Sequence, residues 1–134
     1  MRNSTIVLLQ PTSPLRRDKD ISKCIETFKK NNFDLVFTVA SQDRGILKSG
    51  FVQGNRFIPV AEPEFIFMNR QDLPKLFRPN GAVYVFNGGW FEKNNGFTSN
   101  NVGVVEMPNE NSVDIDNQDD FDRVAQIYKK HSKN

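Results

Sequence analysis

The sequence predicts an α/β fold: a partial doubly wound sheet, mostly parallel, with helices on its faces and a small hairpin excursion. Residues 6–9 and 34–40 are short, almost unbroken apolar runs, which are typical of strands buried on both faces. Residues 18–30 lie between them and carry apolar side chains at the three-and-four spacing of an amphipathic helix. A strand, a helix and a strand at this spacing indicate a βαβ unit with parallel strands.

The first helix is expected to begin at Asp18 or Asp20, because acidic residues favour the first turn, and to end near Asn31. After the strand at 34–40, residues 41–50 predict a polar loop that contains Lys48. Residues 51–59 predict a hairpin with Gly-Asn at its turn. Residues 60–79 predict an irregular excursion with one helical turn near Leu73, the kind of segment that forms a lid, a binding loop or an interface.

The second half of the chain returns to the core. Residues 82–86 and 102–107 predict two further strands, and residues 90–93 a short helix between them. Residues 119–131 predict a final amphipathic helix. Its buried face is expected to contain Phe121, Val124, Ala125, Ile127 and Tyr128. The chain has no internal repeat or linker, so residues 1–134 are expected to form a single domain.

Composition excludes several classes of function. The 134 residues carry a net charge of +2 with acids and bases interspersed, so no nucleic-acid partner is expected. One Cys and one His exclude a disulfide framework and a Cys/His metal site. The sequence shows no apolar run long enough to cross a membrane and no signal sequence. We expect a cytoplasmic protein without a membrane partner.

A stiff polar loop follows the first strand. Gln10 ends the apolar run, and Pro11 and Pro14 prevent further pairing, with Thr12 and Ser13 between them. Ligands of open α/β sheets bind just beyond the carboxyl ends of the strands, so this loop is predicted to border a binding crevice. An ordinary strand-to-helix turn capped by Ser or Thr explains the same residues.

Asp114-Ile115-Asp116 is the sharpest chemical motif. In extended backbone the two carboxylates project to one face while Ile115 faces the core. Two such carboxylates repel unless a cation lies between them, and their hard oxygens suit Mg²⁺. The alternative is that Asp116 caps the final helix and Asp114 is plain surface.

Basic residues and one tyrosine complete the candidates. Lys48, Arg70 and Arg78 are expected in loops near strand ends, where they suit an anionic ligand, although each alone is more often solvated surface. Tyr84 lies within a predicted core strand, so its hydroxyl needs a partner in the core or on a ligand.

Three blocks of sequence, taken together, resemble the acylneuraminate cytidylyltransferases, which are the CMP-sialic acid synthetases and relatives acting on other nonulosonic acids. The blocks occur in that family's order and near its spacing over essentially the whole chain. They are Leu9-Gln10-Pro11-Thr12-Ser13-Pro14-Leu15-Arg16; Arg70-x-x-Leu73-Pro74 leading to Phe77-Arg78-Pro79-Asn80-Gly81-Ala82-Val83-Tyr84; and Val113-Asp114-Ile115-Asp116 with Asp120-Phe121 behind it.

The resemblance implies a Rossmann-like nucleotidyltransferase that moves CMP from CTP to the anomeric hydroxyl of an acidic nine-carbon sugar and releases pyrophosphate. It implies that Asp114 and Asp116 are catalytic and hold Mg²⁺ (or Mn²⁺). Such a reaction depends on positioning and charge neutralisation, for which carboxylates, a metal and cationic side chains are suited.

The resemblance also implies a substrate-binding set. Gln10 contacts the sugar, Lys48 and Arg70 hold its carboxylate and polar tail, and Tyr84 lines its pocket. Asn80 belongs to the same substrate-binding set. The family forms homodimers through an extended arm, and Phe97 matches the place of that arm's aromatic residues, although the local sequence diverges.

One departure limits the resemblance. Nothing here matches the basic, Gly/Ser-rich loop with which the family cradles CTP, so residues 1–134 correspond to the C-terminal sugar- and metal-binding part of the fold. We therefore expect little activity with CTP from this chain alone. We also expect an uncovered edge of the sheet that favours self-association.

Two alternatives from other classes remain. The first is a non-catalytic sugar-binding or dimerisation module derived from the same family. The second is a glycosyltransferase that uses Asp-x-Asp for its metal, against which the Gln-Pro-Thr-Ser-Pro-Leu-Arg block argues.

Overall fold

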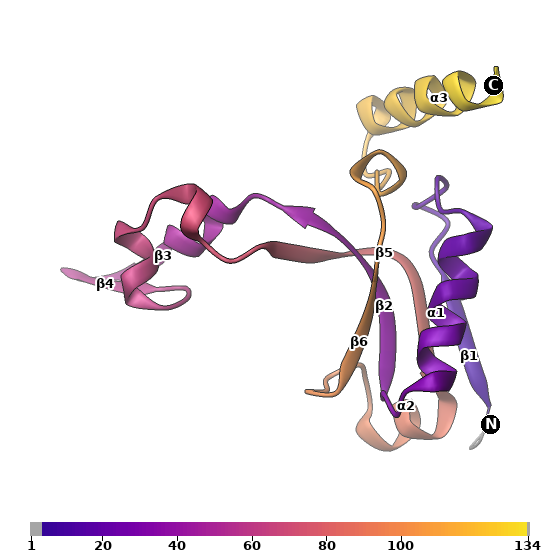
Figure 1. Ribbon diagram of the computed structural model, residues 1–134, viewed down its shortest axis with the longest axis horizontal. Coiled ribbons are helices and arrows are strands. Elements are labelled where there is room, and N and C mark those ends of the chain that lie inside the picture. The colour runs from indigo at the N-terminus through magenta and orange to yellow at the C-terminus, as the bar shows by residue number, and fades with distance from the viewer. Residues whose placement is uncertain (1–3, 134) are drawn as a thin grey trace. The chain divides into compact units, whose positions relative to one another are not determined.

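A computed structural model describes residues 4–133, and in it the chain divides into two compact units. The first contains the described residues up to Ala40 and from Pro79 onward, and the second is Ser41–Arg78. Figure 1 follows the elements of both units along the chain. Within residues 4–133, no helix combines the length and the apolar character that a membrane crossing needs.

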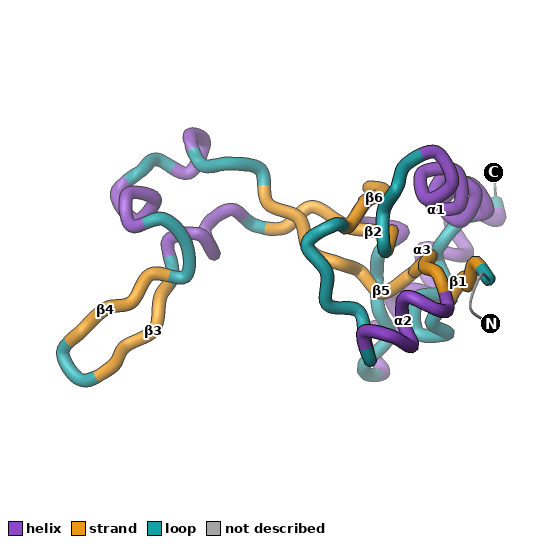
Figure 2. Tube along the Cα trace, turned by 90° about the horizontal axis from the view of Figure 1, so that it is seen from below, coloured by secondary structure: helices purple, strands orange, loops and turns teal. Residues whose placement is uncertain are grey.

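The central sheet has four strands in the order β1, β5, β2, β6 (Figure 2). These are β1 (Thr5–Leu9), β5 (Leu76–Asn87), β2 (Leu35–Gln42) and β6 (Val102–Glu106). β1 pairs antiparallel with β5, whereas β2 and β6 pair in parallel. The predicted α/β class is confirmed, but the predicted mostly parallel sheet is mixed, because β5 pairs antiparallel with β1 and lies between β1 and β2.

The prediction that the first strand is buried on both faces is wrong. β1 is an edge strand of this sheet, so it has a neighbour on one side only. Val7, Leu8 and Leu9 are accordingly 37–40% exposed. An apolar run indicates that a strand favours burial. It does not identify the segment that would bury the strand.

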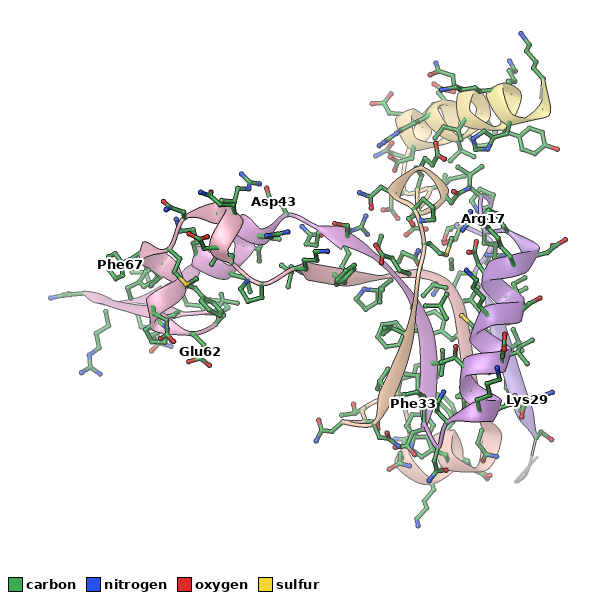
Figure 3. All side chains as sticks on the ribbon, viewed as in Figure 1. Arg17, Lys29, Phe33, Asp43, Glu62 and Phe67 are labelled. Carbon is green, nitrogen blue, oxygen red and sulfur yellow. The ribbon has the colours of Figure 1, made fainter. Side chains whose placement is uncertain are left out.

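α1 (Asp18–Lys30) is confirmed, and it packs against β6 on one face of the sheet. The helix buries Cys24 completely, and this side chain joins a core formed with side chains of β2, β5 and β6. The buried cluster comprises Cys24, Val36, Ala82, Val83, Val85, Val105 and Met107, with Ile21, Ile25, Phe28 and Phe33 packed against it. Arg17 lies at the start of α1 and Phe33 beyond its end (Figure 3).

Two helices follow later in the chain. α2 (Gly88–Asn94) is capped by the preceding residue, Asn87, whose side-chain oxygen accepts the Trp90 N–H at 3.0 Å. α3 (Gln118–Ser132) confirms the predicted final helix, but most of its predicted buried face is not covered. Only Val124 is buried, while Phe121 and Tyr128 are 55% and 67% exposed. The reason is position: α3 lies beyond the end of the sheet (Figure 1), where its neighbours across a shallow hollow are Pro14 and Leu15.

The second unit contains the predicted hairpin, formed by β3 (Gly50–Gln53) and β4 (Arg56–Pro59). Gly54 at its turn has a φ of 59°, a conformation that favours glycine. Short 3-10 helices at Arg44–Lys48, Pro63–Phe67 and Arg70–Asp72 flank the hairpin. The predicted turn near Leu73 is thus confirmed, immediately before that residue.

Candidate active site

Gln10, Gly81 and Tyr84 come together at the end of β1. Leu8 of β1 lies opposite Tyr84 of β5, so the residue that follows β1 reaches the neighbourhood of Gly81. A Cβ atom at Gly81 would lie 2.5 Å from Oε1 of Gln10 and 3.8 Å from the hydroxyl of Tyr84. The absence of a side chain at position 81 therefore leaves the space that the Gln10 amide occupies, beside the phenol.

The segment that carries the two aspartates lies against the same loop. Residues 112–117 run without regular secondary structure into α3. Within this segment the Ile115 N–H donates to the Thr12 carbonyl at 2.8 Å. Because Thr12 is two residues from Gln10, the Asp-x-Asp motif borders the loop that presents the amide.

The two aspartates differ in environment. Oδ1 of Asp114 is buried and has no hydrogen-bond partner among the described residues. The Asp116 side chain is exposed, and its backbone N–H donates to Oδ2 of Asp120 at 3.0 Å. Asn117, not Asp116, caps α3 by accepting the Asp120 N–H at 2.9 Å, so the alternative interpretation of Asp116 as the helix cap is wrong.

A divalent cation suits this donor set. A buried carboxylate oxygen without a partner is costly, and a cation removes that cost. Residues 4–133 contain no group of three or more Asp, Glu, His or Cys side chains arranged to hold a metal. The buried oxygen of Asp114 is therefore the group here that a cation would satisfy, and water or phosphate oxygens would fill most of its other positions, the usual pattern for Mg²⁺.

Asn80 is buried, and its amide is fully engaged within the protein. Its Nδ2 donates to Ser112 Oγ at 3.0 Å and to the sulfur of Met107 at 3.3 Å. Its Oδ1 accepts from Thr38 Oγ1 at 2.6 Å and from the Ala82 N–H at 3.1 Å. These bonds hold the Gly81 region against β2 and against the segment before Asp114, so the geometry is that of a residue that positions others. Its contact with substrate stays a prediction.

Aromatic rings form an apolar wall next to the polar groups. The Tyr84 ring stacks between Phe37, at 6.3 Å between ring centroids, and Phe97, at 5.6 Å. Phe97 also meets Phe86 edge to face at 5.0 Å. The rings of Phe37, Tyr84 and Phe97 line a hollow of about 430 Å³. The structure thus brings Tyr84 and Phe97 together, and it adds Phe37, which the sequence analysis assigned only to a core strand.

Lys48 and Arg70 belong to the second unit. Lys48 ends the first 3-10 helix there, and Arg70 begins the third. The Asp43 carboxylate accepts the Gly45 N–H at 2.8 Å and forms an ion pair with Arg70, and these contacts, in that order, hold the pKa of Asp43 below its ordinary value. The site described above lies wholly in the first unit, and the roles of Lys48 and Arg70 stay predictions.

Comparison with curated proteins shows similarity across most of the chain. An N-acylneuraminate cytidylyltransferase of Streptococcus agalactiae serotype III is 31% identical over 121 residues, covering 89% of this chain and 29% of the relative. The protein of the same name from serotype V is 30% identical over the same length and coverage. The post-translational flagellin modification protein B of Campylobacter coli is 28% identical over 126 residues, covering 93% of this chain and 53% of the relative. No family model matches the chain.

These relatives confirm the resemblance to the acylneuraminate cytidylyltransferases, which are enzymes of the nucleotidyltransferase class. The chain spans less than a third of the length of the streptococcal relatives and about half that of the Campylobacter protein.

Proposed function

We propose that this chain is the sugar- and metal-binding part of a cytidylyltransferase that transfers CMP from CTP to an N-acylneuraminate-type nonulosonic acid and releases pyrophosphate. The observation that supports this most is the meeting of Gln10 and Tyr84 over Gly81, beside the loop contact that holds the Asp-x-Asp segment. The names of the streptococcal relatives support the same reaction class.

In this proposal the first unit recognises the sugar. The Gln10 amide offers a donor and an acceptor to sugar hydroxyls, and the Tyr84 hydroxyl offers a second polar group beside it. Phe97 supplies an apolar surface for the acyl group or the ring face. The positive charges of Lys48 and Arg70, which belong to the second unit, suit the carboxylate of the sugar, and this assignment stays a prediction.

Asp114 and Asp116 hold Mg²⁺ or Mn²⁺ in this proposal. The unpartnered oxygen of Asp114 is the feature of the structure that a cation would satisfy. When bound, the ion supplies charge neutralisation for the phosphates of CTP and a more acidic sugar hydroxyl. The contribution of the chain itself is to keep the carboxylate segment next to the sugar loop, through the Ile115 to Thr12 hydrogen bond.

The proposal includes a cytoplasmic homodimer. Its support is the apolar surface of the second unit, where Phe51, Val52 and Phe67 are 67%, 74% and 89% exposed. A surface of this kind favours association with a second copy. Sedimentation velocity across a range of concentrations tests this part separately from the chemistry.

A chimera tests the reaction. The chain replaces the matching 121-residue segment of the serotype III relative, and pyrophosphate release is measured with CTP, N-acetylneuraminic acid and Mg²⁺. We expect turnover from the chimera and little from the isolated chain. Asp116→Asn in the chimera should lower kcat by about 100-fold or more, because charge stabilisation at the reacting phosphate is lost. Asp119→Asn, which changes an exposed carboxylate in the first turn of α3, is the matched control and should leave kcat unchanged.

The outcomes separate the two candidate functions. A folded chimera that binds N-acetylneuraminic acid in a calorimetric titration but releases no pyrophosphate favours the non-catalytic sugar-binding module. Full turnover with Asp116→Asn removes the metal role from this residue.

A further inference from the structure

Arg16 ties the loop that carries Gln10 to strand β5. A single guanidinium nitrogen, Nη1, donates to three backbone carbonyls. It lies 2.6 Å from the Gln10 carbonyl oxygen, 2.9 Å from that of Ser13 and 3.3 Å from that of Ala82. The first two acceptors belong to the loop after β1, and the third belongs to β5, next to Gly81.

The loop depends on this side chain because it has few donors of its own. Pro11 and Pro14 have no N–H, and the backbone bond from the Ser13 N–H to the Gln10 carbonyl is 3.2 Å long. The charged nitrogen of Arg16 forms hydrogen bonds that are stronger than neutral ones. It therefore supplies the donors that hold the carbonyls of this turn together.

Gln10 meets the same stretch of β5 at its backbone and at the tip of its side chain. At the backbone, the Gln10 carbonyl is held by Arg16, which also holds Ala82. At the tip of the side chain, Oε1 occupies the space left open by Gly81, the residue immediately before Ala82. Both contacts involve the same short stretch of β5, so Arg16 holds the Gln10 backbone where its side-chain amide reaches the space beside Gly81, near Tyr84.

We infer that Arg16 is a positioning residue that sets the orientation of the Gln10 amide toward the substrate. Arg16 acts through its carbonyl contacts and forms no bond to the substrate. The consequence for sugar binding rests on the proposed function, whereas the ordering of Gln10 does not.

Arg17 offers a matched control for a merely structural role. It is the next residue, and its Nη2 and Nε contact the Asp20 carboxylate at 2.7 and 3.0 Å, at the start of α1. Disturbing Arg17 therefore changes the stability of the helix without touching the carbonyls of the Gln10 loop.

The test measures the Gln10 side-chain amide by NMR in the 134-residue chain. In the wild type we expect one pair of sharp Gln10 side-chain amide proton signals at a single position. In Arg16→Met and Arg16→Gln the same signals should shift and broaden, because the backbone that positions the side chain is released. Arg17→Lys should lower the midpoint of urea unfolding yet leave the Gln10 signals unchanged. Unchanged Gln10 signals in a folded Arg16 variant overturn the inference.

A wild-type measurement covers the case in which neither Arg16 variant folds. Three carbonyl contacts should stop rotation about the terminal guanidinium bonds, so Nη1 and Nη2 of Arg16 are expected as separate resonances. A single averaged resonance overturns the inference.

The sugar enters as a separate titration, with N-acetylneuraminic acid as the probe and the chimera described above as the protein. The dissociation constant should rise about tenfold or more in Arg16→Gln, equivalent to about 1.4 kcal/mol, and should not change in Arg17→Lys. If the wild type itself binds no sugar, the proposed function fails while the Gln10 signals still decide the role of Arg16. A dissociation constant that is unchanged in Arg16→Gln, with the wild type binding, counts against the inference.

Discussion

Among single residues, Gly81 has two independent reasons to be glycine. Its φ of 74° is a conformation in which a side chain is strained, and Oε1 of Gln10 occupies the place of its Cβ. Gly54 at the hairpin turn shares only the first reason, since its φ is 59° and no atom lies within 4 Å of the place of its Cβ. Comparing substitutions at Gly81 and Gly54 therefore separates the effect of backbone strain from the effect of contact with Gln10.

Gly81→Ala and Gly54→Ala should each destabilise the protein by about 1 kcal/mol in urea unfolding, because alanine loses its preferred conformation at both positions. Only Gly81→Ala should also displace the Gln10 amide, which is the flexible end of the contact. We expect its NMR signals to shift and the dissociation constant for N-acetylneuraminic acid in the chimera to rise. Equal behaviour of the two variants in the titration would contradict the placement of Gln10.

The sequence could indicate which residues matter at this scale but not how they are used. The substrate contact of Asn80 stays a prediction, whereas its hydrogen bonds to Thr38, 42 positions away, and to Ser112, 32 positions away, could not be predicted. Arg16 is part of the Gln-Pro-Thr-Ser-Pro-Leu-Arg block, but the sequence predicts no role for it. One of its acceptors, Ala82, is 66 positions distant. Hydrogen bonds over such separations depend on the sheet order, which local patterns do not contain.

Among the elements, α1 is the one that the sequence predicted best, since its boundaries and its buried face depend on local spacing alone. Its first turn contains a buried charge, Asp20, which is 1% exposed. Burial raises the pKa of this carboxyl, but hydrogen bonds from the Arg17 side chain and backbone outweigh burial. The net pKa of Asp20 lies below its ordinary value of 3.8.

A group with a lowered folded-state pKa stabilises the protein above its unfolded-state pKa. That stability is lost as the pH falls through the folded-state pKa. Asp20→Asn should therefore lower the free energy of unfolding at pH 7 by roughly 1–3 kcal/mol, because hydrogen bonds to a buried charge are lost. The difference between wild type and variant should begin to shrink below about pH 4, where the carboxyl of the unfolded chain becomes protonated, and should be lost once the pH falls below the lower folded-state pKa. Urea unfolding between pH 2 and 7 measures this, with the exposed Asp18→Asn as the control in the same turn. A difference that is independent of pH would contradict it.

β1 and α3 show where local patterns fail. Both have the apolar spacing of buried elements, and both are partly exposed here, with Leu9 at 38% and Phe121 at 55%. Periodicity identifies the side of an element that avoids water. It does not identify the segment that covers that side, so the type of each element was predicted correctly and its burial was not.

For the whole molecule, the two compact units differ in how much core they possess. The first contains the buried cluster around Cys24, Val36 and Val85. Among residues 41–78, Leu73 alone is buried, at 3% exposure. Local stability follows the number of buried apolar contacts, so the units should open with different free energies.

Hydrogen exchange measured by mass spectrometry should therefore reveal two populations in the monomeric chain at low concentration. Peptides within residues 44–74 should exchange early, and peptides from β2 and from residues 82–86 should exchange last. If the proposed homodimer forms through the apolar surface of the second unit, raising the protein concentration should slow exchange in residues 44–74 and leave the core strands unchanged, because association stabilises only the contacting segment. Phe67→Ser, at a side chain that is 89% exposed, should remove that concentration dependence while preserving the exchange of the first unit. Uniform protection along the chain at low concentration would contradict the difference in core, whereas early exchange of residues 44–74 at every concentration would count against the dimer alone.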